Sequence, residues 1–182
     1  MEAMKEMSDN QFDLAIVDPP YRNASENDMN QWNRKTIKEG RLKNWNDKPD
    51  KEYFNELFRV SKNQKGFVVW RKLSISENFN MSMCEIAFIS NRLGTISKMY
   101  SQAPQQKNRI HPTQKPVKLY EWLLMNYAKE RDTILDTHLG SGSIAIACHN
   151  LGFDLTGYEI DKEYFEAANK RIKQHKAQKR LF

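Results

Sequence analysis

Residues 133–159 read TILDTHLGSGSIAIACHNLGFDLTGYE, and this stretch decides the fold expected for the chain. The apolar run Thr133–Asp136 predicts a short buried strand, and the small polar residues after it predict a turn. The run Ser143–Leu151 predicts a helix that ends at Gly152, and Leu155–Tyr158 predicts a second strand. A strand, a helix and a strand in this order form a parallel βαβ unit, so the sequence predicts an α/β fold.

The turn and the end of the second strand carry a predicted nucleoside site. Gly140 and Gly142 let a ligand come close to the backbone, and Glu159 follows the second strand. In Rossmann-like sheets an acid at about this distance from the turn accepts the ribose hydroxyls. The full GxGxxG pattern and a Walker lysine are missing from this stretch, which disfavours a pyrophosphate or triphosphate ligand.

A second candidate site lies near the N-terminus, where the apolar run Phe12–Val17 predicts another buried strand. The tetrapeptide Asp18-Pro19-Pro20-Tyr21 follows it, and its prolines end the strand because they cannot donate to a sheet ladder. We expect the Asp18 carboxylate and the Pro19 carbonyl to accept the two hydrogens of a nucleobase amine, while Tyr21 stacks on the ring. The alternative is a simple strand-ending turn.

Length, charge and cysteine content narrow the class of protein. The chain has 182 residues, which suits a single α/β domain, and its net charge of +6 favours a polyanionic partner, with nucleic acid first. Its two cysteines, Cys84 and Cys148, predict neither a disulfide framework nor a zinc site. No apolar run approaches the ~18 residues of a membrane span, and the first residues do not resemble a signal peptide. We therefore expect a cytoplasmic protein without a membrane partner or a metal.

Residues 22–50 form a basic insertion that is a candidate target-recognition element. Residues 31–51 hold seven Lys or Arg against three acids, with few aliphatic residues. Positive charge interleaved with aromatic rings suits a segment that follows phosphates and contacts bases. The alternative is a solvated insertion. The candidate DNA-binding residues are Trp32, Arg34, Lys35, Arg41, Lys43 and Trp45.

The segment His111-Pro112-Thr113-Gln114-Lys115-Pro116 precedes a predicted helix that begins at Val117. A helix N-terminus with Thr113 and Lys115 just ahead of it suits an anion or a carboxylate. The alternative is an ordinary helix start flanked by prolines.

Further elements are predicted from apolar periodicity. Asp50 is the expected N-cap of a helix through Val60, with an apolar stripe of Tyr53, Phe54, Leu57 and Phe58. The last helix is expected from Lys162 to about Gln174, with Phe165, Ala168 and Ile172 facing inward. The predicted strands are Gly66–Trp70, Cys84–Ile89 and Gly94–Tyr100, the last two as a hairpin.

The order of these motifs resembles the circularly permuted β-class of S-adenosylmethionine-dependent DNA amino-methyltransferases, in particular short phage-borne adenine-N6 enzymes. The likeness covers most of the chain outside residues 22–50. It implies a single domain over residues 1–182, with a Rossmann-like, doubly wound sheet that is mostly parallel and has one antiparallel strand. It also implies another core strand and loop between Gln64 and Lys65, which this chain lacks.

The resemblance assigns roles to the motifs. The turn Asp18-Pro19-Pro20-Tyr21 would hold the target amine, and Asp at position 18 favours adenine N6 over cytosine N4. Glu159 would bind the ribose of S-adenosylmethionine, and Thr113 and Lys115 would lie near its carboxylate. The other residues assigned to the cofactor lie in the glycine turn: Asp136, His138, Gly140, Ser141 and Gly142.

Double-stranded DNA is the partner that the resemblance implies. Whether the protein forms a homodimer stays an open question. Three alternatives to adenine-N6 methylation also stay open. The first is cytosine-N4 methylation in the same pocket, and the second is a catalytically inactive DNA-binding remnant. The third is methylation of RNA or of a protein side-chain amide, against which the basic insertion argues.

Overall fold

The computed structural model describes residues 2–19, 49–62, 64–73, 84–91, 98–103, 109–111 and 113–178. Its elements are α1 (Glu2–Lys5), β1 (Leu14–Ala15), α3 (Lys51–Val60), β2 (Gln64–Arg71), β3 (Cys84–Asn91), β4 (Lys98–Ser101), α4 (Val117–Tyr127), β5 (Thr133–Asp136), α5 (Ser143–Leu151), β6 (Asp154–Gly157) and α6 (Lys162–Ala177). None of the helices in these ranges is long and apolar enough to cross a bilayer.

The predicted βαβ unit is the centre of the fold. Strand β5 pairs in parallel with β6 on one side and with β1 on the other, in register Leu14↔Ile134 and Leu135↔Thr156. Because side chains alternate along a strand, Ile134 and Leu135 face opposite sides of the sheet, and both are fully buried. The sheet therefore has an apolar core on each face.

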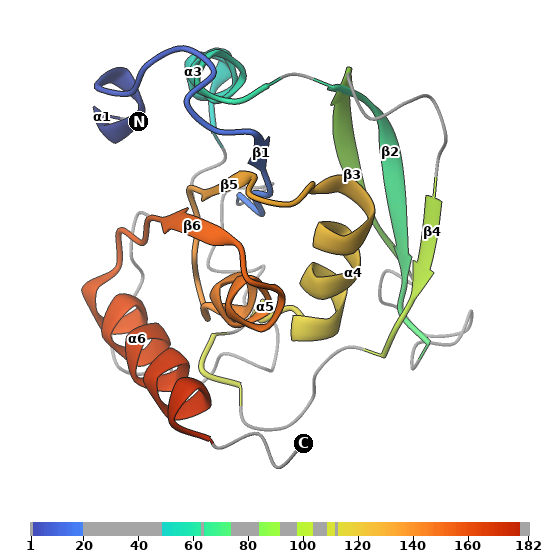
Figure 1. Cartoon of the computed structure of the whole chain (residues 1–182), viewed down its shortest axis with the longest axis vertical. Helices are drawn as coiled ribbons and strands as arrows, with labels where there is room; N and C mark the ends of the chain where they lie inside the picture. Colours follow the sequence, from blue (N-terminus) through green and yellow to red (C-terminus); the bar gives the residue numbers. More distant parts are fainter. Residues whose placement is uncertain are drawn as a thin grey trace, which may run out of the picture.

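Helices cover both faces of this sheet, as the doubly wound fold requires. On one face, α4 and α5 bury a cluster with Leu14, Ile134 and Leu124. On the other face, α1 and α3 bury a cluster with Leu135, Met4 and Val60. Figure 1 shows β1, β5 and β6 between these helices, with α6 beside α5 at the outside.

A second sheet of three strands has the order β3-β2-β4, so the hairpin predicted between residues 84–89 and 94–100 is wrong. Both outer strands pair with β2 instead, β3 antiparallel and β4 parallel. Helix α4 lies between the two sheets (Figure 1), where the Trp122 ring stacks on Tyr100 of β4 with centroids 5.0 Å apart. Lys98 of β4 also donates to the Asn126 side chain at 2.7 Å.

The pairing agrees with the predicted α/β class, since β3 is the one antiparallel strand among those described. The described strands form two sheets, and the segment that leads into β2 touches the first sheet through a parallel bridge between Phe12 and Ser61. The core strand and loop that the resemblance implies between Gln64 and Lys65 are missing from this chain, and β2 runs through both residues, from Gln64 to Arg71.

The inward faces predicted for α3 and α6 are partly wrong, as the exposure of their side chains shows. In α3, Tyr53, Leu57 and Val60 are buried, whereas Phe54 and Phe58 are 38% and 46% exposed. The spacing i, i+4, i+7 of the buried set defines the inward face, and the two phenylalanines lie about 100° further round the helix. In α6, Ala168 is buried as predicted, but Phe165 is 45% exposed.

Candidate functional site

Three acids lie at the carboxyl ends of three neighbouring strands. Asp18 follows β1, Asp136 is the last residue of β5, and Glu159 follows β6. Because the strands are parallel, their carboxyl ends share one edge of the sheet, where open α/β sheets bind ligands. Each carboxylate of the outer pair also acts electrostatically on Asp136. The structure thus brings together the three acids that the sequence singled out.

Asp18 is held by a side-chain cation. The Lys115 ammonium donates to its Oδ2 atom at 2.6 Å, and the lysine side chain is only 9% exposed while the Asp18 side chain is 32% exposed. Lys115 belongs to the segment before α4, 97 positions away in the chain. This ion pair joins two motifs that the sequence assigned to different ligands, the target amine and the cofactor carboxylate.

Asp136 is the most deeply buried of the three acids. Burial raises the pKa of its carboxyl to about 7, and the charges of Asp18 and Glu159 act in the same direction. A hydrogen bond from the His138 main-chain N–H to Oδ1, at 2.9 Å, favours the ionised form and opposes this rise. Asp136 therefore titrates near neutral pH.

The Glu159 carboxylate accepts hydrogen bonds from two main-chain N–H groups. The Gly140 N–H donates to Oε2 at 2.7 Å, and the Asp161 N–H donates to Oε1 at 2.9 Å. The turn is tied to β6 a second time, because the Leu139 N–H donates to the Tyr158 carbonyl at 2.8 Å. The glycine turn and the acid thus form one rigid unit.

The two turn glycines are required by conformation. Gly140 and Gly142 have φ of 52° and 70°, in the left-handed region that side chains rarely adopt. Gly142 is also packed, because a Cβ there would lie 3.0 Å from Ile172 Cδ1 of α6. It is the N-cap of α5 and supplies no side-chain cap. The first N–H groups of α5 are thus left without a side-chain partner from the N-cap residue.

Two histidines flank the turn. The His138 ring lies edge-on to Tyr53, and its Nδ1 is 3.0 Å from the Thr137 hydroxyl, which in turn contacts the Tyr53 hydroxyl at 2.7 Å. The His111 ring packs against Tyr164 with centroids 4.4 Å apart. Burial lowers the pKa of both histidines to about 4, so both are neutral at pH 7.

Thr113 is the exposed member of the predicted set. Its N–H and hydroxyl both lie within hydrogen-bond distance of His111 Nδ1, at 3.3 and 3.1 Å. The turn 111–113 therefore closes on itself, and Thr113 contacts none of the three acids in the hydrogen bonds of the described residues.

Two residues join the site that the sequence did not single out for it. Ser143 of α5 is 2% exposed and donates to the Lys115 carbonyl at 2.8 Å. Arg171 of α6 donates to the Ser141 carbonyl and to the Ser143 hydroxyl, at 2.8 and 2.9 Å. No local pattern marks either residue, since one looks like a helix start and the other like one of many basic residues on the last helix.

Several predicted site residues lie outside the described ranges. These are Pro20, Tyr21, Trp32, Arg34, Lys35, Arg41, Lys43 and Trp45. Their roles stay predictions.

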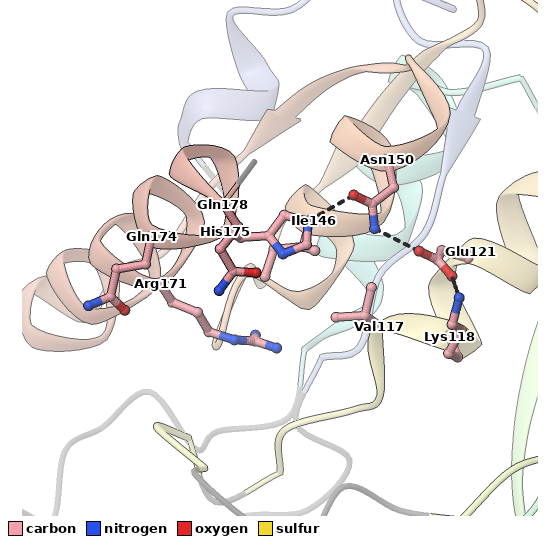
Figure 2. A pocket seen from close by; sticks show the side chains of 9 residues that line it. All are labelled: Val117, Lys118, Glu121, Ile146, Asn150, Arg171, Gln174, His175 and Gln178. Carbon is pink, nitrogen blue, oxygen red and sulfur yellow. Dashed lines mark hydrogen bonds and ion pairs between the residues drawn. The ribbon is translucent and has the colours of Figure 1, made fainter. Parts of the chain in front are cut away.

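An open pocket of about 510 Å³ lies away from the acids, between α4, α5 and α6 (Figure 2). Its polar side chains are bonded in a row: Lys118 to Glu121 at 2.8 Å, Asn150 to Glu121 at 2.7 Å, and His175 to Asn150 at 2.8 Å. Arg171 lines this pocket and also reaches the glycine turn. The pocket contains none of the residues predicted for the target or the cofactor.

Comparison with known sequences identifies the family. The profile described as DNA methylase, of the N6/N4 type, matches residues 38–170. The chain is similar to the type II methyltransferase M.HpaI of Haemophilus parainfluenzae, with 43% identity over 67 residues, which are 36% of this chain and 21% of that protein. The chain spans between a fifth and a quarter of the length of the curated relatives it matches.

Solved structures share the fold over nearly the whole chain. M1.HpyAVI in complex with S-adenosylmethionine superposes with a TM-score of 0.56 at 22% identity, covering 93% of this chain and 91% of that one. The cytosine-N4-specific PvuII DNA methyltransferase superposes with a TM-score of 0.58 at 12% identity, covering 94% and 86%. These likenesses show an α/β methyltransferase fold with mostly parallel strands. Since the profile matches more than half of its length, the chain belongs to the N6/N4 DNA methylase family.

Proposed function

We propose that this protein transfers a methyl group from S-adenosylmethionine to the exocyclic N6 of adenine in double-stranded DNA. The observation that carries the proposal is the edge formed by Asp18, Asp136 and Glu159, with a glycine turn between the last two. Family membership supports the reaction class. The chain order, with Asp18 ahead of the glycine turn, supports placing it in the circularly permuted β-class.

The residues at this edge fit S-adenosylmethionine, which supplies a methyl group on a positively charged sulfur. Glu159 keeps acceptor capacity for ribose hydroxyls, because a carboxylate has about four lone-pair sites and two are used by Gly140 and Asp161. Asp136 suits the cationic group of an amino acid, and the start of α5, where Gly142 supplies no side-chain cap, suits its anionic group. Ile160, next to Glu159, is 87% exposed and offers apolar surface for a flat base.

Asp18 and Pro19 would act on the target amine. The amine of adenine is a poor nucleophile because its lone pair is delocalised into the ring. Two acceptors, the Asp18 carboxylate and the Pro19 carbonyl, would accept hydrogen bonds from its two N–H groups and so concentrate the lone pair on nitrogen. The nitrogen would then form a bond to the methyl carbon as the sulfonium S–C bond breaks, and the methylated amine would lose one proton. Lys115 fixes one Asp18 oxygen at 2.6 Å and so orients the carboxylate for this contact. The base must leave the duplex to reach this edge, at a cost of a few kcal/mol, and Tyr21 is proposed to stack on it.

Cytosine-N4 methylation is the second candidate, because the same two acceptors suit that amine and the PvuII enzyme shares the fold. Nucleoside mass spectrometry of duplex DNA, after incubation with the protein and S-adenosylmethionine, separates the two. We expect N6-methyladenine, and N4-methylcytosine in its place would overturn the assignment of the base. DNA binding without either product, and without cofactor binding by calorimetry, would indicate an inactive DNA-binding remnant.

Residues 22–50 are proposed to contribute electrostatic affinity for DNA. Replacing both Arg34 and Lys35 by Ala should reduce the salt dependence of DNA binding by about 0.9 in the slope of log K against log salt for each lost phosphate contact. The control is the replacement of Lys173 and Lys176 by Ala, because these two lysines are exposed on α6 and the double variant loses the same charge at another place. Equal slopes in both double variants would assign the segment to solvation.

A further inference from the structure

Arg171 connects the last helix to the glycine turn. One of its terminal nitrogens, Nη1, donates to the Ser141 carbonyl at 2.8 Å and to the Ser143 hydroxyl at 2.9 Å. Figure 2 shows the side chain extending from α6 along the wall of the pocket. A guanidinium with two acceptors on neighbouring residues fixes their relative position more firmly than a single bond does.

Ser143 continues this connection toward the target site. Its hydroxyl accepts from Arg171 and donates to the main-chain carbonyl of Lys115 at 2.8 Å, so its one proton and an acceptor site are both used. The Lys115 ammonium then donates to Asp18 at 2.6 Å. Four residues from four segments of the chain thus form one hydrogen-bonded row: Arg171, Ser143, Lys115 and Asp18.

The two middle residues of the row are buried. Ser143 is 2% exposed and Lys115 is 8% exposed. In such surroundings a missing partner leaves a desolvated polar group unpaired, which is more harmful than the loss of a surface hydrogen bond. Ser143 and Lys115 therefore depend on their protein partners for hydrogen bonding.

The charge of Arg171 lies in a place where it is not expected to stabilise the fold. Its charge lies beside the first residues of α5, where the partial positive charge of the helix disfavours a cation. Burial also lowers the pKa of Arg171, which shows that the surroundings disfavour the charge. An apolar residue often stabilises such a place as well as a charged one does. What the arginine alone provides is the double contact with the turn.

We propose that Arg171 and Ser143 are positioning residues for the methyl transfer. Ser143 fixes the backbone of Lys115, and through it the Asp18 carboxylate. Arg171 fixes Ser143 and, through the Ser141 carbonyl, also the glycine turn assigned to the cofactor. This inference rests on the proposed function, and it extends the site to α6.

Two substitutions separate the two contacts. Ser143→Ala removes the bond to the Lys115 carbonyl and the other contacts of the Ser143 hydroxyl but leaves the Arg171 contact with the Ser141 carbonyl. Arg171→Met removes both bonds that Arg171 donates and leaves the bond from Ser143 to Lys115. We expect kcat to fall by about tenfold in each variant, since each loses at least one hydrogen bond that fixes Ser143 or its partners. Cofactor affinity, measured by calorimetry, should fall clearly only in Arg171→Met. Lys170→Met, one position earlier and exposed, is the matched control and should change neither value.

A double-mutant cycle with Lys115→Met tests whether the effect passes through Lys115. Lys115→Met alone should lower kcat, and adding Ser143→Ala to it should lower kcat by less than about twofold further. Arg171→Lys keeps a donor for the Ser143 hydroxyl and should restore part of the lost kcat. A second tenfold loss in the double variant would overturn the proposal, as would a fall in melting temperature with unchanged kcat per folded molecule.

These outcomes differ from a failure of the proposed function. If the parent protein neither binds S-adenosylmethionine nor methylates DNA, the function itself is wrong. If the parent does both and Arg171→Met and Ser143→Ala match it, only the positioning role is wrong. Arg171→Lys and Ser143→Ala change few atoms, so either one keeps the test decisive should Arg171→Met fold poorly.

Discussion

Asp18 and Glu159 lie at the same edge of the sheet but are held in different ways. Asp18 is paired with a side chain, the buried Lys115 ammonium. Glu159 accepts two main-chain N–H groups, from Gly140 and Asp161. A carboxylate bonded to the backbone moves only if the turn moves, whereas Asp18 gives one oxygen to Lys115 and its side chain stays 32% exposed.

The difference indicates which acid is suited to which task. A fixed acceptor is suited to binding, because its geometry is set before the ligand arrives and little entropy is lost. A partly exposed acceptor with one oxygen held by a cation is suited to a substrate group that binds, reacts and leaves. This comparison supports assigning Glu159 to the cofactor and Asp18 to the target amine.

The largest expected effect is at Asp18. Asp18→Ala should lower methyl transfer to DNA by about 10²–10⁴-fold, since a positioned acceptor of the amine hydrogens is lost. Binding of S-adenosylmethionine, measured by calorimetry, should stay nearly unchanged. Asp18→Asn keeps an acceptor for Lys115 and separates the loss of charge from disturbance of the buried lysine. Near-normal methyl transfer in Asp18→Ala would mean that this turn only ends the strand and has no role in the reaction.

Asp136 lies between the two acids and should make stability depend on pH. Its pKa is about 7 in the folded protein against 3.8 ordinarily, so unfolding between these values releases a proton. The free energy of unfolding that Asp136 contributes should therefore fall as the pH rises from about 4 to 7, by about 4 kcal/mol at most. The difference between the parent and Asp136→Asn, from denaturant unfolding at each pH, isolates this contribution.

That subtraction is necessary because His111 and His138 act in the opposite direction. Their pKa values fall from 6.5 to about 4 on folding, so the stability they provide is lost as the pH falls through this range. The neighbours of Asp136 sharpen the comparison further. Asp18→Asn should lower the Asp136 pKa more than Glu159→Gln does, because Asp18 has the larger influence. A flat difference between parent and Asp136→Asn would show that Asp136 titrates normally.

Glu159→Ala should weaken binding of S-adenosylmethionine by about tenfold to a hundredfold, because a charged hydrogen-bond acceptor contributes about 1.5–3 kcal/mol. Calorimetry measures this loss directly. Glu159→Gln keeps one oxygen for the backbone donors, and its affinity for S-adenosylmethionine should lie between those of Glu159→Ala and the parent protein. Glu166→Ala removes an exposed acid of α6 and is the control. Unchanged affinity in Glu159→Ala would remove the distinction between the two acids.

The smallest effect tests the rigidity of the Glu159 side. Gly142 and Gly152 have similar φ, 70° and 77°, but a Cβ meets Ile172 Cδ1 at 3.0 Å at the first and nothing within 4 Å at the second. Both Ala variants should lose about 1 kcal/mol from backbone strain. Gly142→Ala should lose about 1 kcal/mol more from overpacking against α6, as read from denaturant unfolding. Equal losses would mean that Ile172 moves aside freely.

The βαβ unit was predictable because its signals are local. Strand β5 and helix α5 have the predicted bounds, Thr133–Asp136 and Ser143–Leu151, and Gly152 ends the helix in the left-handed conformation. Asp50 accepts the Tyr53 N–H at 2.8 Å, as its position before α3 predicted. An apolar period, a cap and a glycine act within a few residues of themselves, so one segment contains the whole signal.

The second sheet and the inward faces were less predictable. Which strand pairs with which depends on non-local contacts, and so β2 lies between β3 and β4 where a local hairpin was expected. The predicted apolar stripe of α3 likewise included Phe54 and left out Val60, which is the buried one, because local spacing does not show which side of a helix meets the core.

The sequence by itself determined the parallel unit, its glycine turn and the identity of the three acids, because parallel strands bring their carboxyl ends to one edge. Only the tertiary structure decided how those acids are held. The Lys115 ion pair spans 97 positions, and Arg171 contacts Ser141 across 30 positions. Such contacts leave no periodicity or spacing in the sequence, because they arise when separately predictable elements pack and their buried polar groups must find partners.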